Sequence, residues 1–302
     1  MKAHVIVIFL FGILSCKERT SEMPTKGTAV VLVSETMTFL LQNEADQFHS
    51  LYPDASITIF PTTTREAIVD LLNGEVTGIV VDRPLNLEER QISSRAELQL
   101  EETSIARDGL ALIVNKRNPL SVVSMEVVGG ILRKSINDWK DIGITKWTGV
   151  IEVAMTGRNS GVFDLVHTYF FPSDSIIVPT FLAPQLSDVV AFVSNHPLGI
   201  GIASKAFMSR HADTSALKIL EIIQKDSLSR IVAVKPTQET IYKHEYPLTY
   251  TLYMYTVAKK ANAANGFSAF LMSPPGQKII MDEGFVPEHI PFRTIQLTDQ
   301  TP

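Results

Sequence analysis

Residues 155–163, MTGRNSGVF, place one arginine, an amide, a hydroxyl and two glycines between two apolar runs. The glycines allow close approach to the backbone, and Ser160 can cap a following helix while it offers its hydroxyl. Arg158 carries a planar fork of donors that suits tetrahedral oxyanions, although an arginine can equally pair with any surface carboxylate. Because a helix start adds free N–H groups and about half a positive charge, the stretch predicts an anion site at the mouth of a helix.

Three other turns offer comparable chemistry. SETM at 34–37 follows an apolar run, so Ser34 or Thr36 could cap a helix whose free N–H groups suit an anion. PTTTRE at 61–66 places three hydroxyls before a helix, and Asp82 puts a carboxylate at the end of another apolar run. Each turn alone fits a simple cap or turn residue, whereas four such turns in one chain favour a ligand site.

The elements that must position these turns follow from the hydrophobic periodicity. Apolar runs of strand length predict strands at 29–33, 56–60, 77–81, 151–155 and 199–203, and helical spacing predicts helices at 37–51, 65–72 and 162–170. This alternation predicts parallel sheets covered by helices, and its return in the middle of the chain predicts two α/β lobes. In such sheets ligands bind beyond the carboxyl ends of the strands, where the four turns would lie.

Composition limits the classes of partner. The chain has 302 residues, of which 45% are hydrophobic and 20% charged, enough for two lobes with their own cores. Its formal net charge is -5 and it has no run of basic residues, so no diffuse positive field would recruit nucleic acid. Any bound anion must therefore be held by local geometry.

The N-terminus is typical of a secretory signal. Met1-Lys2 is followed by apolar residues 5–14, too few to span a bilayer, and then by Ser15 and Cys16. Cys16 is the only cysteine, which excludes a disulfide within the chain. Its setting resembles the lipobox of bacterial lipoproteins and so implies cleavage before Cys16, acylation of its thiol and anchoring at the cell envelope; a free cysteine within a plain signal peptide is the alternative. Residues 17–26 are polar and aperiodic, as in a tether.

The order of several short motifs resembles the phosphate-binding protein of phosphate ABC importers, the PstS family. The motifs are SETM at 34–37, VDRPL at 81–85 after Gly74, NDW at 137–139, GRNSG at 157–161, YPL at 246–248, LY at 252–253, FL at 270–271, SPPGQK at 273–278 and GFVP at 284–287. The similarity covers nearly everything after the tether, and it depends on the order and spacing of these motifs together.

This resemblance implies a type 2 periplasmic-binding-protein fold, an α/β architecture of two lobes that close on a ligand. Each lobe would be a mixed sheet flanked by helices, with the ligand in the cleft between the lobes. The chain would cross between lobes near Asn115 and near Tyr246. The implied divisions are a signal peptide at 1–16, the tether at 17–26, lobe I at 27–114 and 247–296, and lobe II at 115–246.

The resemblance also implies the residues that bind phosphate. By position they are Thr36, Met37, Thr64, Asp82, Arg158, Ser160, Gly161 and Val162. Amides, hydroxyls and one guanidinium can satisfy the anion without a metal or a cofactor. An ionised Asp82 can only accept a hydrogen bond, so it would accept the proton of hydrogen phosphate and reject sulfate, which has none at neutral pH.

Two departures from the family pattern leave the ligand open. Val162 stands where the family usually has a threonine, so one hydroxyl donor is missing. The turn at 62–66 lacks the family's glycines and carries Arg65, which is the candidate replacement donor. Another oxyanion or a small anionic organic ligand therefore remains an alternative to phosphate.

We expect a binding protein rather than an enzyme: a monomeric, exported lipoprotein that captures inorganic phosphate and delivers it to an ABC permease. A sensing or partner-binding module on the same clamp fold is an alternative. A hydrolase is the least supported reading, because Ser160 is one residue off the spacing of a nucleophile elbow and the seven histidines show no metal-binding pair. His167 lies within a predicted helix, where a structural role is the simpler interpretation.

Overall fold

The computed structural model describes residues 23–145, 147–171, 177–210, 212–226, 228–258 and 262–290. The predictions for the signal peptide, Cys16 and most of the tether lie outside these residues, as does the end of lobe I at 291–296. Among the helices described, none is long and apolar enough to cross a membrane.

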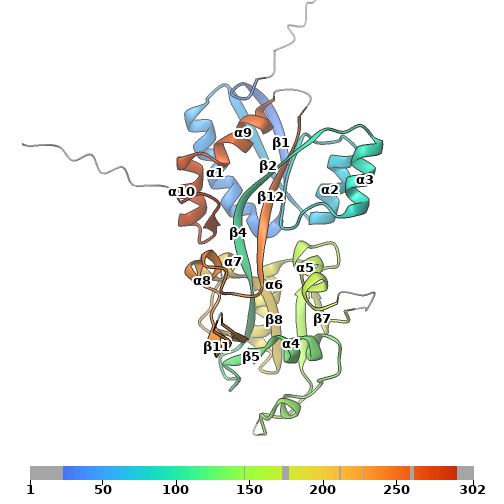
Figure 1. The fold of residues 1–302 in the computed structure, drawn as a ribbon, viewed down its shortest axis with the longest axis vertical. Helices are drawn as coiled ribbons and strands as arrows, with labels where there is room; N and C mark the ends of the chain where they lie inside the picture. Colours follow the sequence, from blue (N-terminus) through green and yellow to red (C-terminus); the bar gives the residue numbers. More distant parts are fainter. Residues whose placement is uncertain are drawn as a thin grey trace, which may run out of the picture.

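The chain forms two lobes joined by two long strands (Figure 1). The joining strands are β4 (Leu100–Asn115) and β12 (Thr249–Val257). The first lobe contains β1 (Gly27–Ser34), η1 (Glu35–Met37), α1 (Thr38–Leu51), β2 (Ala55–Thr62), α2 (Thr64–Leu72), β3 (Gly78–Val81), α3 (Leu87–Arg95), α9 (Ala263–Leu271), α10 (Pro274–Asp282) and β13 (Val286–Pro287). The second contains β5 (Val122–Ser124), α4 (Met125–Leu132), η2 (Trp139–Ile142), β6 (Glu152–Thr156), α5 (Gly161–Phe170), β7 (Phe181–Ala183), α6 (Leu186–Asn195), β8 (Gly199–Ser204), α7 (Lys205–Arg210), β9 (Leu217–Ile219), β10 (Glu221–Lys225), β11 (Ile231–Val234) and α8 (Gln238–Tyr242).

The main sheet is mixed and continuous through both lobes. Its strand order is β2-β1-β3-β12-β4-β8-β6-β7. The β1 strand pairs in parallel with β2 and β3, and β6 pairs in parallel with β7 and β8, whereas β12 and β4 run antiparallel to their neighbours. The predicted α/β class with two lobes is confirmed, and the five predicted strands correspond to β1, β2, β3, β6 and β8.

The β4 strand passes from one lobe to the other without a break. Its residues from Leu100 to Gly109 pair with β12, and those from Leu110 to Val114 pair with β8. The exchange of partners therefore falls between Gly109 and Leu110, earlier than the crossing predicted near Asn115, where the strand ends. Near the return crossing, the buried Tyr246 donates its hydroxyl to the Leu110 carbonyl oxygen at 2.7 Å, just before β12 begins.

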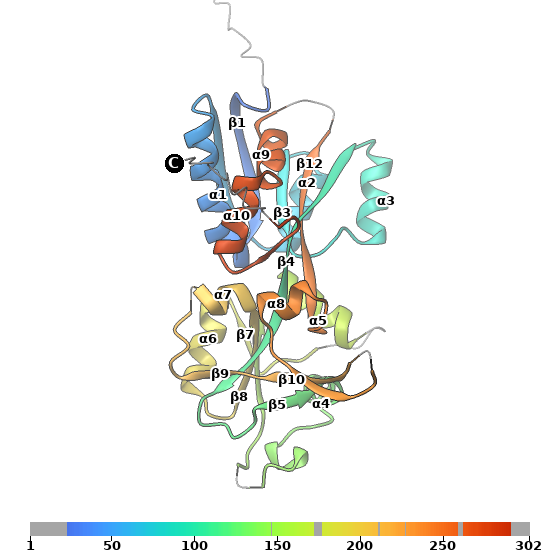
Figure 2. The ribbon, with the colours of Figure 1, turned by 60° about the vertical axis from the view of Figure 1, so that its left-hand side comes forward.

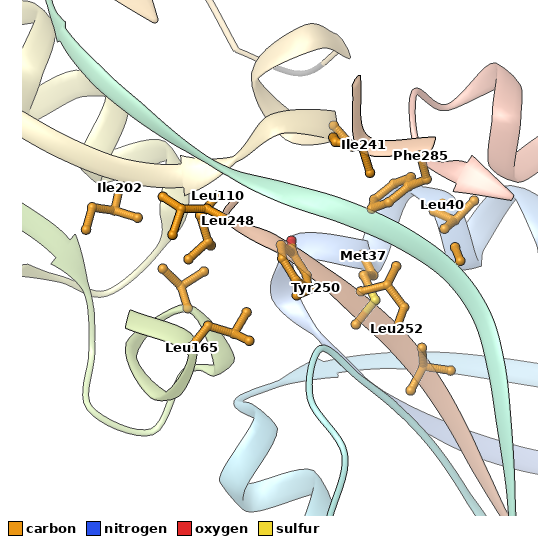
Figure 3. Close-up of a cluster of buried hydrophobic side chains, with 14 of the residues drawn as sticks. Met37, Leu40, Leu110, Leu165, Ile202, Ile241, Leu248, Tyr250, Leu252 and Phe285 are labelled. Atoms are coloured by element: carbon orange, nitrogen blue, oxygen red, sulfur yellow. The ribbon is translucent and has the colours of Figure 1, made fainter. Parts of the chain in front are cut away.

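One hydrophobic cluster follows the joining strands through both lobes (Figure 3). Leu165 and Ile202 of the second lobe belong to it, and so do Met37 and Leu40 of the first. Tyr250 of β12 lies between these two groups of side chains. Figure 2 shows the same two strands as the connection between the lobes, with α7 and α8 of the second lobe facing α10 of the first.

Candidate functional site

The carboxyl ends of β1 and β3, together with the start of α2, surround one carboxylate. Asp82, the residue after β3, is fully buried. Its Oδ1 accepts a hydrogen bond from the Thr64 hydroxyl at 2.6 Å, and its Oδ2 accepts one from the Ser34 hydroxyl at 3.1 Å. The Ser34 hydroxyl also lies 3.3 Å from that of Thr36. Parallel strands end at the same edge of a sheet, which is why turns so far apart in sequence meet here.

Burial dominates the ionisation of this carboxylate. Desolvation raises the pKa of Asp82, the hydrogen bonds from Thr64 and Ser34 oppose that rise, and the negative charge of Asp164 adds to it. The two hydroxyls therefore stabilise a charge that the surroundings otherwise disfavour.

The start of α5 in the second lobe lies directly against Asp82. A Cβ atom added to Gly161 would lie 1.5 Å from Oδ1 of Asp82, so only a residue without a side chain fits at this contact. Ser160 caps α5, as predicted, by accepting a hydrogen bond from the Phe163 amide at 3.2 Å. The hydroxyl of Ser160 lies 2.7 Å from that of Thr156 at the end of β6.

Ionic groups of both lobes meet beside this contact. Asp164, on the first turn of α5, accepts a hydrogen bond from Arg65 at 2.6 Å and another from Arg83 at 2.8 Å. Arg83 also pairs with Glu89 at 2.8 Å. The Arg65 amide donates to the carbonyl oxygen of Asn159 at 3.2 Å. We call the side chains of Arg65, Arg83, Glu89 and Asp164 the interlobe ion network.

The structure brings most of the predicted site residues to one region. Thr36 and Met37 lie in η1, Thr64 begins α2, and Asp82 contacts Gly161, next to Ser160 and Val162; all seven are buried. Their role in binding an anion stays a prediction. The structure also corrects one local expectation: neither Ser34 nor Thr36 caps a helix, because Ser34 makes no cap bond and η1 separates it from α1.

The two predicted arginines, Arg158 and Arg65, have exposed side chains and are not buried in the cleft. Arg158 is exposed in the turn before α5, and the structure shows no hydrogen bond or ion pair of its side chain with any described residue. Arg65 points to Asp164, within the interlobe ion network. The hydroxyls of Thr62 and Thr63, which the sequence offered as anion donors, bond instead to the Glu66 carboxylate at 2.9 and 2.8 Å.

Sequence reasoning did not assign a role to Arg83, Asp164 or Glu35. Arg83 lies within the quoted VDRPL motif, and an acidic residue on a first helical turn, such as Asp164, is ordinary helix chemistry. Glu35 lies within SETM, between residues that were assigned. Arg83 and Glu35 could have been noticed because they lie within the quoted motifs. Their position in the sequence does not show where their long side chains point.

A cavity of about 600 Å³ opens between the lobes next to these turns. One wall comes from the first lobe and the other from the starts of α6 and α7. The lining residues are Glu35, Thr38, Phe39, Pro61, Thr62, Thr63, Glu66, Gln185, Leu186, Ser187 and Phe207. Burial raises the pKa of Glu35 to about 7, and the charges of Asp82 and Asp188 add to this rise.

Two observations bear on catalysis and metal binding. Within the described ranges, no three His, Cys, Asp or Glu side chains gather in a way that could hold a metal ion. His167 is partly buried on α5 and stacks on Phe171, with 6.1 Å between ring centroids, as a structural residue would.

The sequence is similar to those of known phosphate-binding proteins over most of its length. The phosphate-binding protein PstS of Pseudomonas aeruginosa is 24% identical over 274 residues, covering 84% of this chain and 81% of that protein. PstS of Staphylococcus saprophyticus is 24% identical over 273 residues, covering 89% and 80%.

Solved structures share the fold. A proposed phosphate ABC transporter substrate-binding protein from Clostridium perfringens, solved with bound phosphate, superposes with a TM-score of 0.74 at 20% identity, covering 87% of this chain and all of that one. An ABC-type phosphate transport receptor from Vibrio cholerae gives a TM-score of 0.68 at 20% identity, covering 86% of this chain. The family model of the PBP superfamily domain matches residues 19–275, so the chain belongs to the periplasmic-binding-protein superfamily.

Proposed function

We propose that this protein is an exported solute-binding lipoprotein that captures inorganic phosphate between its lobes and delivers it to an ABC importer. The observation that carries the proposal is the meeting of Asp82 with Gly161. A buried carboxylate held by two hydroxyls lies at the ends of the first lobe's strands, against the first residue of a helix in the other lobe. The relatives named as phosphate-binding proteins, aligned over most of this chain, support the same ligand.

The chemistry of the assembled groups suits hydrogen phosphate. Hydroxyls of Thr36 and Ser160, with the amides at the start of α5, are donors for its oxygens. Thr64 would contribute its backbone amide, because its hydroxyl proton is donated to Asp82. An ionised Asp82 accepts the proton that hydrogen phosphate retains and sulfate lacks. Asp82 would therefore disfavour sulfate, because two acceptor oxygens with no proton between them repel each other and lose a hydrogen bond to a charged group, which contributes about 1.5–3 kcal/mol.

The route of the ligand requires movement of the lobes. Asp82 and Gly161 are too close for an anion to lie between them, so we place phosphate beside this contact, where it enters when the lobes separate and is held when they approach again. The two joining strands, β4 and β12, are the elements about which such a movement would occur. We propose that Arg158 turns toward the anion on binding, that Cys16 carries the lipid anchor, and that the protein acts as a monomer without catalysis.

Calorimetric titration tests this proposal directly. The purified protein, freed of bound ligand by unfolding and refolding, is titrated with phosphate and then with sulfate. Binding of phosphate alone at one site per chain is the expected result. Binding of neither anion would contradict the proposal.

The size of the interlobe cavity favours a second candidate. A volume of about 600 Å³ is within the range of sites that hold organic ligands. A small organic phosphate could place its phosphate group near Asp82 and its remainder in the cavity. Titration with glycerol phosphate distinguishes this candidate, since it would bind more tightly than inorganic phosphate.

A further inference from the structure

Glu35 introduces a second carboxylate beside the proposed phosphate site. It lies in η1 between Ser34 and Thr36, is partly buried and lines the interlobe cavity. The structure shows no hydrogen bond or ion pair of its carboxylate with a described residue, since only its backbone carbonyl oxygen accepts a bond, from Thr38 at 3.0 Å. A helix cap or structural ion pair therefore does not explain this side chain.

The charged groups around Glu35 are mostly acidic. Asp82 at the end of β3 and Asp188 on α6 both act on its charge, and Glu66 on α2 lines the same cavity. Asp188 accepts a hydrogen bond from the Gln185 amide at 3.2 Å, and Glu66 accepts hydrogen bonds from the Thr62 and Thr63 hydroxyls. Neither carboxylate forms an ion pair with a cation among the described residues.

The nearby cations are committed elsewhere. Arg65 and Arg83 belong to the interlobe ion network, where they bond to Asp164. Lys205, which begins α7, is buried and donates to the Gly284 carbonyl oxygen at 2.9 Å. The remaining cation is Arg158, the exposed arginine that we propose turns toward the anion. An anion that enters the cleft thus adds negative charge to a region where the carboxylates outnumber the free cations.

Resting on the proposed function, we infer that Glu35 takes up a proton when the cleft captures its anion, so that binding is favoured at acidic pH. Like charges in a partly buried site repel strongly, because the effective dielectric there is well below that of water. Protonation of Glu35 removes one negative charge from the site and turns its carboxyl into a donor for an anion oxygen. Glu35 then links ligand capture to pH.

The surroundings of Glu35 in the ligand-free site already favour its protonated form. Burial, then the charges of Asp82 and Asp188, raise the pKa of Glu35 to about 7. A bound anion raises this pKa further, since a negative charge nearby disfavours the ionised carboxylate. For a pKa of about 7, the protonated fraction falls about tenfold between about pH 6 and pH 8. The apparent affinity falls by the same factor if only the protonated form binds.

The experiment compares the wild-type protein with Glu35→Gln by calorimetric titration with inorganic phosphate at about pH 6, 7 and 8. Phosphate itself titrates in this range, but it does so equally in both titrations, so the ratio of the two affinities isolates Glu35. We expect this ratio to change about tenfold from pH 6 to pH 8, with the wild-type protein weakened at high pH. In buffers of different ionisation enthalpy, the wild-type protein should take up about half a proton more than Glu35→Gln at pH 7.

Glu66→Gln is the matched control, because Glu66 lines the same cavity but its carboxylate already bonds to two hydroxyls. It should retain the wild-type pH dependence. Parallel affinity profiles for the wild-type protein and Glu35→Gln would overturn the inference while leaving phosphate binding intact. Failure of every variant to bind phosphate at any of these pH values would remove the proposed function and this inference with it.

Discussion

Gly161→Ala should abolish tight phosphate binding without harming the fold. The added methyl carbon would lie 1.5 Å from Oδ1 and 2.1 Å from Cγ of Asp82. An ordinary contact of a Cβ atom is 3.4–4 Å, so the carboxylate or the whole lobe must move by roughly 2 Å. The substitution therefore acts on the approach of the two lobes and not on the interior of either.

The energy follows from the bonds that hold Asp82. Displacing its carboxylate breaks hydrogen bonds from Thr64 and Ser34, and bonds to a charged group contribute about 1.5–3 kcal/mol each. Keeping the cleft closed without these two bonds would cost about 3–6 kcal/mol, which corresponds to a loss of affinity of about 10²- to 10⁴-fold. The ligand-free protein avoids this cost, because its lobes can separate and leave the Asp82 carboxylate in place. If the lobes separate instead, α5 no longer contributes to the site, and this also lowers the affinity for phosphate.

Calorimetric titration with phosphate measures this loss, and thermal unfolding of the ligand-free protein checks the fold. Gly157→Ala is the control in the same turn, because a Cβ atom at Gly157 would have no heavy atom of the described residues within 4 Å, its two chain neighbours aside. We expect Gly157→Ala to bind like the wild-type protein. Alanine at the first position of α5 also improves helix propensity, so the melting temperature of Gly161→Ala should not fall. Unchanged phosphate affinity in Gly161→Ala would refute the proposed closure of Asp82 on α5.

Three further substitutions test the remaining assignments. Asp82→Asn supplies an amide in place of the acceptor, so sulfate should compete with phosphate; an unchanged anion preference in competition titrations would contradict the role of Asp82. Arg158→Ala should weaken phosphate binding by about tenfold or more with little change in the melting temperature of the ligand-free protein, because this side chain is exposed; equal affinity in calorimetry would remove Arg158 from the site. Glu44 is buried, both its carboxylate oxygens lack a partner among the residues that the structure describes, and burial raises its pKa from 4.5 to about 9. The folded state therefore keeps a proton that the unfolded state releases, and the free energy of unfolding falls as pH rises between these values, by up to about 4 kcal/mol from pH 5 to pH 8. Glu44→Gln should remove this dependence in urea unfolding, and an unchanged slope against pH would contradict it.

The periodicity of the sequence located the elements because each depends on local spacing. The run at 29–33 became part of β1, buried except at Val30, and the alternation at 56–60 became part of β2. Ser160 followed by an apolar helical pattern placed the start of α5 correctly, since a cap and its helix are neighbours in the chain. Helical spacing did not reveal η1, because a short 3₁₀ turn ahead of α1 preserves the same apolar positions.

The crossing between lobes had no local signal. The residues of β4 from Gly109 to Asn115 are all buried, and the apolar pattern runs through the exchange of partners without interruption. A strand that changes its neighbours keeps its own backbone conformation, so its sequence carries no mark at that position.

By itself the sequence determined where the turns with capping residues, glycines and hydroxyls lie, because these residues act through the backbone next to them. Only the tertiary structure decided how these turns combine. Asp82 meets Gly161, and Arg65 and Arg83 both reach Asp164, through contacts between residues about eighty to one hundred positions apart. The direction of a long arginine side chain depends on which carboxylate the fold brings near it, and this is why Arg158 is exposed while Arg65 and Arg83 join the two lobes.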